Sequence, residues 1–338
     1  MKIVECVPNF SEGNNEHTFE QMKKSLSGVQ NCKLLSFEPD ADYNRVVVTM
    51  AGDEHGILEG ALSISRTAAQ LIDMTKHKGE HPRMGAIDVV PFVPVKNISM
   101  EECVKISEAF AERVSQELNI PIYLYEAAAR KPERQNLANI RKGEYEGLPE
   151  KLKDKNWLPD YGTNQFNPKL GGTVTGARFF LIAYNVNLKS EDVKYAKEIS
   201  EILRESGYVK KDENGNTIKV NGQSVKVPGK LKSVKGMGVA LEKYKMTQVS
   251  MNLTNYNVTP IHVAFEEVKK EAFRLGVEVT GSEIVGLVPL EALLLAGKYY
   301  SQGRNLDEKS LVDLAILKLG LSDLHTFSKT DKIIDYMI

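Results

Sequence analysis

The sequence is poor in the features that mark secreted, membrane and metal-thiolate proteins. Its 338 residues contain three cysteines, Cys6, Cys32 and Cys103, and no Cys-x-x-Cys pair. An odd number of scattered cysteines argues against a disulfide scaffold and a thiolate zinc site, and favours a reducing compartment. The longest apolar stretch, residues 287–296, is broken by a proline and a glutamate. No stretch approaches the ~20 apolar residues that span a bilayer, so we expect no membrane association.

The sequence also lacks an excess of charge of either sign. It has 44 Lys and Arg against 45 Asp and Glu, which gives a formal net charge of −1. This balance argues against bulk electrostatic binding of nucleic acid, although it permits a local basic pocket. Acidic Glu5 lies where a secretory signal peptide needs an apolar run, so we expect a cytoplasmic protein. With 42% hydrophobic residues the chain can bury a large core, and its length allows two domains.

Hydrophobic periodicity predicts the same order of elements in both halves of the chain. The first half is expected to run strand, helix, strand, strand, helix, strand, helix, strand over residues 3–7, 17–26, 33–37, 45–50, 54–74, 87–93, 99–118 and 122–125. The second half is expected to repeat the first six elements over 179–186, 191–206, 234–242, 247–253, 258–275 and 284–288, with a helix at 290–296. A local similarity between Asp88–Val95 and Glu283–Leu290 supports this internal duplication.

The repeated βαββαβ order predicts an α/β (α+β) protein made of two ferredoxin-like split βαβ subdomains, residues 1–178 and 179–338. The two sheets would face each other with their helices outside, and small molecules favour the cleft between such subdomains. Two segments fall outside the repeat. One is a charged stretch at 130–161, and the other is a lysine-rich hairpin within 210–235. We interpret the hairpin as a solvated structure rather than as an arm that steers a ligand.

The densest group of reactive side chains lies between a predicted helix and a buried strand, in Lys76–Gly85. It holds two His, one Glu, one Arg and two Lys within ten residues. Loops beside a sheet often carry catalytic groups, so a histidine general acid/base is one interpretation and a solvated charged loop is another. His77 and His81 have the spacing of a metal-binding pair on a helix. Gly79 and Pro82 disfavour that helix, so we expect no metal.

The glycine-rich stretches do not support nucleotide-dependent chemistry. Gly171–Gly176 lacks the Lys and Ser/Thr of a phosphate-binding loop, and Gly236–Gly238 lacks the third glycine of the dinucleotide fingerprint. The run at 160–172 offers Gly, Thr, Asn and Gln, which permit close backbone approach and paired hydrogen bonds to a heterocycle. Its composition alone favours an ordinary linker between domains.

Three blocks, Val4–Gly13, His77–Gly85 and Val285–Pro289, resemble the glutamate formiminotransferase family, and the similarity covers essentially the whole chain. The family includes the N-terminal part of vertebrate formimidoyltransferase-cyclodeaminase. The resemblance implies transfer of the formimino group of N-formimino-L-glutamate to N5 of tetrahydrofolate in histidine degradation. It also implies a homodimer of two α/β subdomains with folate bound between them. Since nothing follows Ile338 in the sequence, we expect a separate cyclodeaminase to act next.

The resemblance also implies roles for particular residues. His81 matches the catalytic histidine, and Glu38 is our choice for a supporting carboxylate, with Asp40 in reserve. The folate-binding stretch corresponds to Gly162, Thr163, Asn164, Gln165, Phe166, Asn167, Pro168, Lys169, Leu170 and Gly171. His81 would take the proton from folate N5 and return it to the departing glutamate nitrogen. Arg83 and Arg178 are candidates to pair with the carboxylates of the substrates.

Three alternatives stay open on the sequence. A relative on the same scaffold would transfer a formyl group, using formylglutamate or 5-formyltetrahydrofolate as the donor. A non-catalytic folate-binding protein would bind folate without turnover. A metal hydrolase using His77 and His81 would need stoichiometric zinc.

Overall fold

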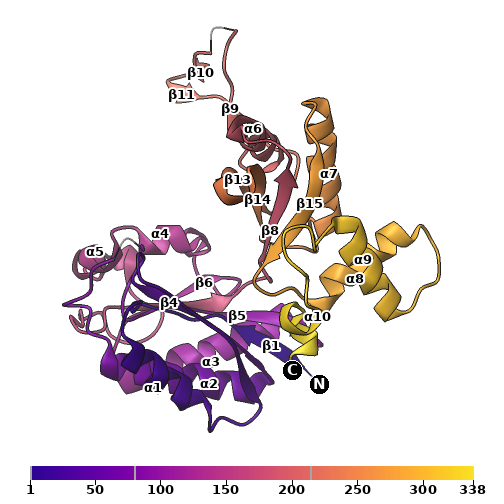
Figure 1. Cartoon of the computed structure of the whole chain (residues 1–338). Coiled ribbons are helices and arrows are strands. Elements are labelled where there is room, and N and C mark those ends of the chain that lie inside the picture. Colours follow the sequence, from indigo (N-terminus) through magenta and orange to yellow (C-terminus); the bar gives the residue numbers. More distant parts are fainter. Residues whose placement is uncertain (1, 80, 214) are drawn as a thin grey trace. The chain divides into compact units, whose positions relative to one another are not determined.

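The molecule contains two compact units, Met1–Phe179 with Ile338, and Phe180–Met337 (Figure 1). Each unit is built from a sheet with helices packed on it, so the expected mixed α/β class is confirmed. The expectation that the two sheets face each other stays a prediction. In the part of the chain that is described, no helix is both long and apolar enough to cross a membrane. The structure is a computed structural model that describes residues 2–79, 81–213 and 215–338.

A seven-stranded sheet forms the centre of the first unit. Across the sheet the strands follow the order β3 (Cys32–Asp40), β4 (Arg45–Gly52), β1 (Ile3–Cys6) with β2 (Asn9–Phe10), β5 (Ile87–Lys96), β7 (Thr173–Ala177) and β6 (Ile122–Glu126). The strands from β3 to β5 pair antiparallel in the order expected for a split βαβ unit. Strands β7 and β6 extend the sheet by parallel pairing beyond β5.

Three helices cover one face of this sheet: α1 (Glu16–Leu26), α2 (Glu54–Leu71) and α3 (Met100–Leu118) (Figure 1). Each begins at a polar residue whose side chain accepts a backbone N–H of the first turn, namely Asn15, Asp53 and Ser99. Their apolar faces and the inward residues of the strands form one buried core. Burial of these faces removes them from water and fixes the helices on the sheet.

The segment that lies outside the repeat packs on the opposite face of the same sheet. It holds α4 (Leu137–Arg141), α5 (Glu144–Lys151) and two short 3₁₀ turns at Pro132–Arg134 and Lys155–Trp157. Its apolar residues form a second, smaller core with side chains of β5, β6 and β7: Met84, Val89, Tyr123, Tyr125, Ile140, Leu148, Leu152 and Val174. This charged segment is therefore a structural cover over one end of the sheet, with α4 and α5 opposite α1 to α3 (Figure 1).

The second unit contains a four-stranded antiparallel sheet in the order β13 (Val234–Leu241), β14 (Met246–Leu253), β8 (Ile182–Leu188) and β15 (Val279–Val285). With α6 (Val193–Leu203) after β8 and α7 (Ile261–Arg274) after β14, the order is that of a split βαβ unit. Helices α8 (Leu290–Ser301), α9 (Glu308–Leu319) and α10 (Lys329–Lys332) follow. The predicted hairpin is formed by β9 (Tyr208–Val209), β10 (Lys219–Val220), β11 (Gln223–Ser224) and β12 (Lys226–Val227).

Several boundaries differ from the expectations. The last strand of the second unit ends at Val285, so the strand expected at 284–288 was placed too late. Gly286, with a φ of +76°, turns the chain at that point. The match of Asp88–Val95 to Glu283–Leu290 therefore aligns the middle of β5 with the end of β15. Strand β7 was not predicted at all, and neither was helix α9.

Candidate functional site

His81 lies in the loop between α2 and β5, beside the turn that joins β3 to β4. Asn44 in that turn holds the loop twice: its Nδ2 donates to a loop carbonyl at 2.7 Å, and its own carbonyl lies 2.9 Å from Nε2 of His77. Gly79 packs directly on the turn, because a Cβ at this position would lie 2.5 Å from the carbonyl oxygen of Tyr43. The loop that carries His81 is thus fixed by side-chain hydrogen bonds and close packing against the β3–β4 turn.

The far end of the same loop contacts two other blocks of the sequence. Ser11 Oγ donates to the carbonyl of Gly85 at 2.8 Å, and Ala86 N donates to the carbonyl of Leu170 at 2.9 Å. Gly85 and Gly171 pair as an isolated antiparallel bridge. The structure therefore brings together three regions that are far apart in the sequence: the N-terminal block, the histidine loop and the end of the glycine-rich stretch.

The imidazole of His81 is half-buried among guanidinium groups. Its Nε2 lies 3.2 Å from Nη1 of Arg45. Because a guanidinium only donates hydrogen bonds, Nε2 accepts, and the ring is the neutral tautomer with its proton on Nδ1. Burial lowers the pKa of His81 to about 4, helped by the charges of Arg45, Arg141 and Arg83 and opposed by Asp40. His81 is therefore an unprotonated base at neutral pH.

The carboxylate that acts on His81 belongs to Asp40 rather than to Glu38. Glu38 is exposed, and its carboxylate accepts a hydrogen bond from Ser36 Oγ. Asp40 ends β3 directly opposite Arg45, at the turn beside the histidine loop, and it raises the pKa of His81. Asp40 lies two residues beyond Glu38 in β3, so its carboxylate is at the end of the sheet where His81 lies. The structure thus favours the reserve residue over our first choice.

The two arginines expected to pair with substrate carboxylates are not positioned for that role beside His81. Arg83 is buried, with 6% exposure, and its guanidinium pairs with Glu144 at 3.0 Å and with Glu146 at 2.6 Å. Arg178 follows β7, whereas His81 precedes β5. These strands are parallel, so the two residues lie at opposite ends of the pair. Arg83 is therefore committed within the protein, and Arg178 is remote from His81.

The stretch from Gly162 to Gly171 is an ordered loop beside the histidine loop. Its end glycines have φ values of +80° and +68°, which other residues rarely adopt. The side-chain oxygen of Asn167 accepts the backbone N–H groups of two following residues at 3.1 Å. Tyr145 of α5 donates to the carbonyl of Pro168 at 2.6 Å. Several residues of the stretch are exposed, namely Asn164, Gln165, Pro168 and Lys169, although the Lys169 ammonium donates to the carbonyl of Gln70 at 3.0 Å.

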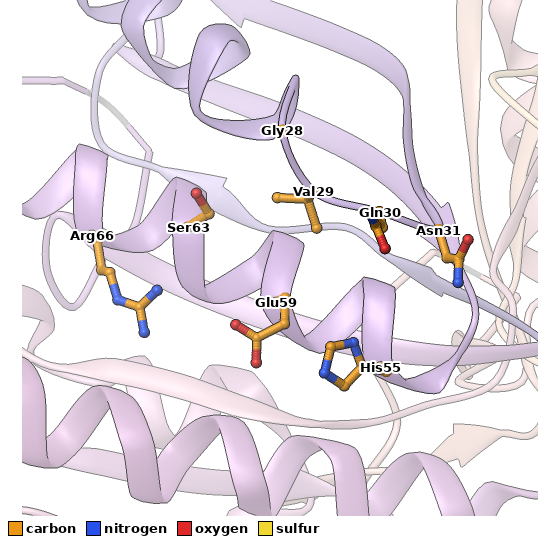
Figure 2. Close-up of a pocket in the computed structure, with 8 residues that line it drawn as sticks. All are labelled: Gly28, Val29, Gln30, Asn31, His55, Glu59, Ser63 and Arg66. Carbon is orange, nitrogen blue, oxygen red and sulfur yellow. The ribbon is translucent and has the colours of Figure 1, made fainter.

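Besides a hollow lined by Leu58, Lys105 and Ile106, two surface hollows lie on the helical side of this unit. The one in Figure 2 lies between the α1–β3 connection and α2, and its lining includes His55, Glu59 and Arg66. None of the residues predicted for the site lines it. The other lies between α2 and α3 and is lined in part by Asn167, Lys169 and Leu170, so one side of the glycine-rich stretch faces it.

The geometry of His77 opposes a metal site shared with His81. Its Nδ1 accepts from Arg83 Nε at 3.4 Å, and its Nε2 lies 2.9 Å from the carbonyl of Asn44. Both ring nitrogens therefore have partners within the protein, and neither lone pair is directed at a shared ion. That the protein works without a metal stays a prediction.

Three residues of this site were missed from the sequence: Arg45, Asp88 and Arg141. Arg45 could have been found by pairing β3 with β4 across their turn, which places it opposite Asp40. Arg141 ends α4 and bonds to the buried carboxylate of Asp88, 53 residues earlier in the chain. No local pattern encodes that contact, because it depends on how the covering segment folds back onto β5.

Comparisons with known proteins match the entire chain. The family models described as "Formiminotransferase domain, N-terminal subdomain" and "Formiminotransferase domain" match residues 3–178 and 183–338. The glutamate formimidoyltransferase of Streptococcus pyogenes serotype M1 is 45% identical over 306 residues, which are 90% of this chain and 95% of that protein. The Thermoplasma acidophilum protein of the same name is 42% identical, over 93% of this chain and 97% of its own. The formimidoyltransferase-cyclodeaminase of Mus musculus is 47% identical over all of this chain, which spans 60% of that relative's length.

Proposed function

The chain belongs to the formiminotransferase family, and on that premise we propose that it is a glutamate formimidoyltransferase. The resemblance seen in the three sequence blocks is thereby confirmed. The proposed reaction moves the formimino group of N-formimino-L-glutamate to N5 of tetrahydrofolate and releases L-glutamate. The observation that carries the proposal is His81, which burial and the neighbouring Arg45 keep unprotonated in the loop whose far end contacts the N-terminal block.

The chemistry requires a base that later becomes an acid. The donor is an amidine whose carbon is electrophilic without a metal, and the secondary amine at N5 attacks it. Nε2 of His81 takes the proton that N5 loses as the new C–N bond forms. It returns this proton to the glutamate nitrogen as the old C–N bond breaks. Acid/base catalysis of this kind contributes ~10²–10⁴-fold, and alignment of two bound substrates ~7–11 kcal/mol of the barrier.

Further parts of the proposal rest on the family. Tetrahydrofolate would bind as co-substrate along Gly162–Gly171, which adjoins the histidine loop through Leu170. We place the enzyme in histidine degradation, in the cytoplasm and as a homodimer. A cyclodeaminase would act on its product, since the mouse relative is named for a formimidoyltransferase and a cyclodeaminase together.

A transfer assay with two donors tests the proposal. We expect turnover of tetrahydrofolate with formiminoglutamate and little with formylglutamate. The variant His81→Ala should lose ~10²–10⁴-fold in kcat. His17→Ala, which changes an exposed histidine of α1, should keep the wild-type rate. Preference for formylglutamate would establish the formyl-transferring alternative. Folate binding without turnover of either donor would establish the non-catalytic one. Turnover by His81→Ala at the wild-type rate would show that His81 does not take part in the reaction.

A further inference from the structure

Two arginine side chains flank His81 and hold donor groups without acceptors. Arg45 is the first residue of β4, and its Nη1 also donates to Asn9 Oδ1 at 3.4 Å. Arg141 is the last residue of α4 and bonds to Asp88 of β5. Both charges act on His81. The Nε groups of both arginines are buried and have no hydrogen-bond partner among the described residues.

The charge of Arg45, which no carboxylate of the described residues offsets, makes this pair an anion site. No carboxylate of the described residues lies within ion-pair distance of Arg45, while Arg83 already has Glu144 and Glu146. The charge of Arg45 faces only two neutral acceptors, Asn9 Oδ1 and His81 Nε2, and a carboxylate with two oxygens satisfies a guanidinium best. We propose that Arg45 and Arg141 together bind a carboxylate of the formimino donor beside His81. This inference rests on the proposed function.

The position of the pair selects the donor as the source of the carboxylate. In formiminoglutamate a carboxylate lies within a few bonds of the nitrogen that leaves, whereas the carboxylates of tetrahydrofolate lie at the far end of the molecule from N5. Arg45 is in direct contact with the ring atom that must reach both N5 and the leaving nitrogen. A carboxylate held there therefore belongs to the glutamate moiety of the donor.

Binding at this pair also prepares the base. A carboxylate is a stronger acceptor for Arg45 than the imidazole, so it draws Nη1 away from Nε2 of His81 and frees that lone pair. The anion also offsets the positive charges that disfavour protonation of His81. The groups that face the ring are Arg45 from β4, Arg141 from α4, Arg83 from its own loop, Asp40 from β3 and the edge of Tyr43, whose centroid is 6.3 Å away. Donor binding should thus raise the proton affinity of His81 when the reaction needs it.

Calorimetric titration of the whole chain with L-glutamate tests the pair without turnover. Arg45→Gln removes one guanidinium. Because Arg141→Gln alone would leave Asp88 buried and unpaired, the second variant is Asp88→Asn with Arg141→Gln, which keeps a hydrogen bond between the two side chains. We expect the Kd for L-glutamate to rise 10–100-fold in both variants. Arg113→Gln, which changes an arginine paired with Glu59 on the helical side, should bind like the wild type.

A second titration separates the two sources of carboxylate. Tetrahydrofolate and tetrahydropteroate, which lacks the glutamate, should each bind the variants within threefold of the wild type. Unchanged glutamate binding in both variants would overturn the inference. A loss of affinity confined to tetrahydrofolate would also overturn it, because it would assign the pair to the glutamate tail of folate. Circular dichroism melting confirms that each variant is folded. The transfer assay judges the proposed function separately, since glutamate binding requires no turnover.

Discussion

His81 differs from an ordinary histidine in the charge it carries near neutral pH. An imidazole with a pKa near 6.5 is partly protonated there, whereas burial and the neighbouring guanidiniums lower the pKa of His81 to about 4. The unfolded chain binds this proton more readily than the folded one. Titration of His81 therefore leaves the free energy of unfolding unchanged above pH 6.5. It lowers this free energy increasingly as the pH falls from 6.5 towards 4.

We expect the Cε1–H resonance of His81 to titrate near pH 4 in the free protein. The measurement is an NMR titration of histidine-labelled chain, with His81→Asn to assign the signal. Loss of positive charge in Arg45→Gln should move the midpoint upward. In activity, kcat/KM should not show a histidine limb between pH 6 and 7. A midpoint near 6.5 in the wild type would contradict the electrostatic account of the site.

Glu5 is a second residue whose ionisation is set by burial. It is 4% exposed in β1, and burial raises the pKa of its carboxyl to about 7, against the lowering charge of Arg178. A raised pKa means that its contribution to stability is complete below pH 4.5 and is lost as the pH rises through 7. We expect Glu5→Gln to stabilise the protein by about 3 kcal/mol at pH 8 and by less than about 0.5 kcal/mol at pH 4.5. Urea unfolding at the two pH values measures both, and equal effects at both would show that charge is not the cause.

At the level of elements, the split βαβ order of both units was predictable because each strand and helix carries its own apolar periodicity. Strand β7 was not, since Thr173–Ala177 has few aliphatic residues and two flanking glycines. It is a strand because β5 and β6 pair with it on both sides. The same contrast between local pattern and tertiary contact applies to the site. His81 and the neighbouring blocks could be recognised from local motifs, whereas Arg141 could not. Its role depends on a tertiary contact with Asp88.

The glycine-rich stretch offers a test of its own geometry. Gly171 has a φ of +68°, and a Cβ there would lie 2.4 Å from the carbonyl oxygen of Met84. Gly171→Ala should therefore separate the stretch from the histidine loop, with a loss of about 1–3 kcal/mol in stability and a weaker affinity for tetrahydrofolate. Gly147→Ala in α5, where a Cβ meets nothing within 4 Å, is the matched control and should bind folate normally. Folate affinity is measured by quenching of Trp157 fluorescence. Unaltered folate affinity in Gly171→Ala would show that folate binding does not depend on the contact between Gly171 and the histidine loop.

At the scale of the whole molecule, the near-zero net charge suits the proposed substrates. A small carboxylated molecule needs a few basic groups in fixed positions, and the structure supplies them at Arg45 and Arg141 rather than over a broad surface. The sequence could indicate this balance but not the positions. Arg83, the basic residue closest in sequence to His81 among our candidates, is neutralised by α5.

The 338-residue polypeptide is expected to perform the transfer reaction alone. It covers 60% of the length of relatives named formimidoyltransferase-cyclodeaminase and nearly all of those named glutamate formimidoyltransferase. Ring closure with loss of ammonia is the step that the name cyclodeaminase implies. We therefore expect the purified polypeptide to release one glutamate per formimino group transferred and no ammonia. Enzymatic assays of both products follow the reaction, and addition of a purified cyclodeaminase should then release ammonia in equal amount. Ammonia formed by the polypeptide alone, at the rate of glutamate release, would mean that a second activity resides in these two units.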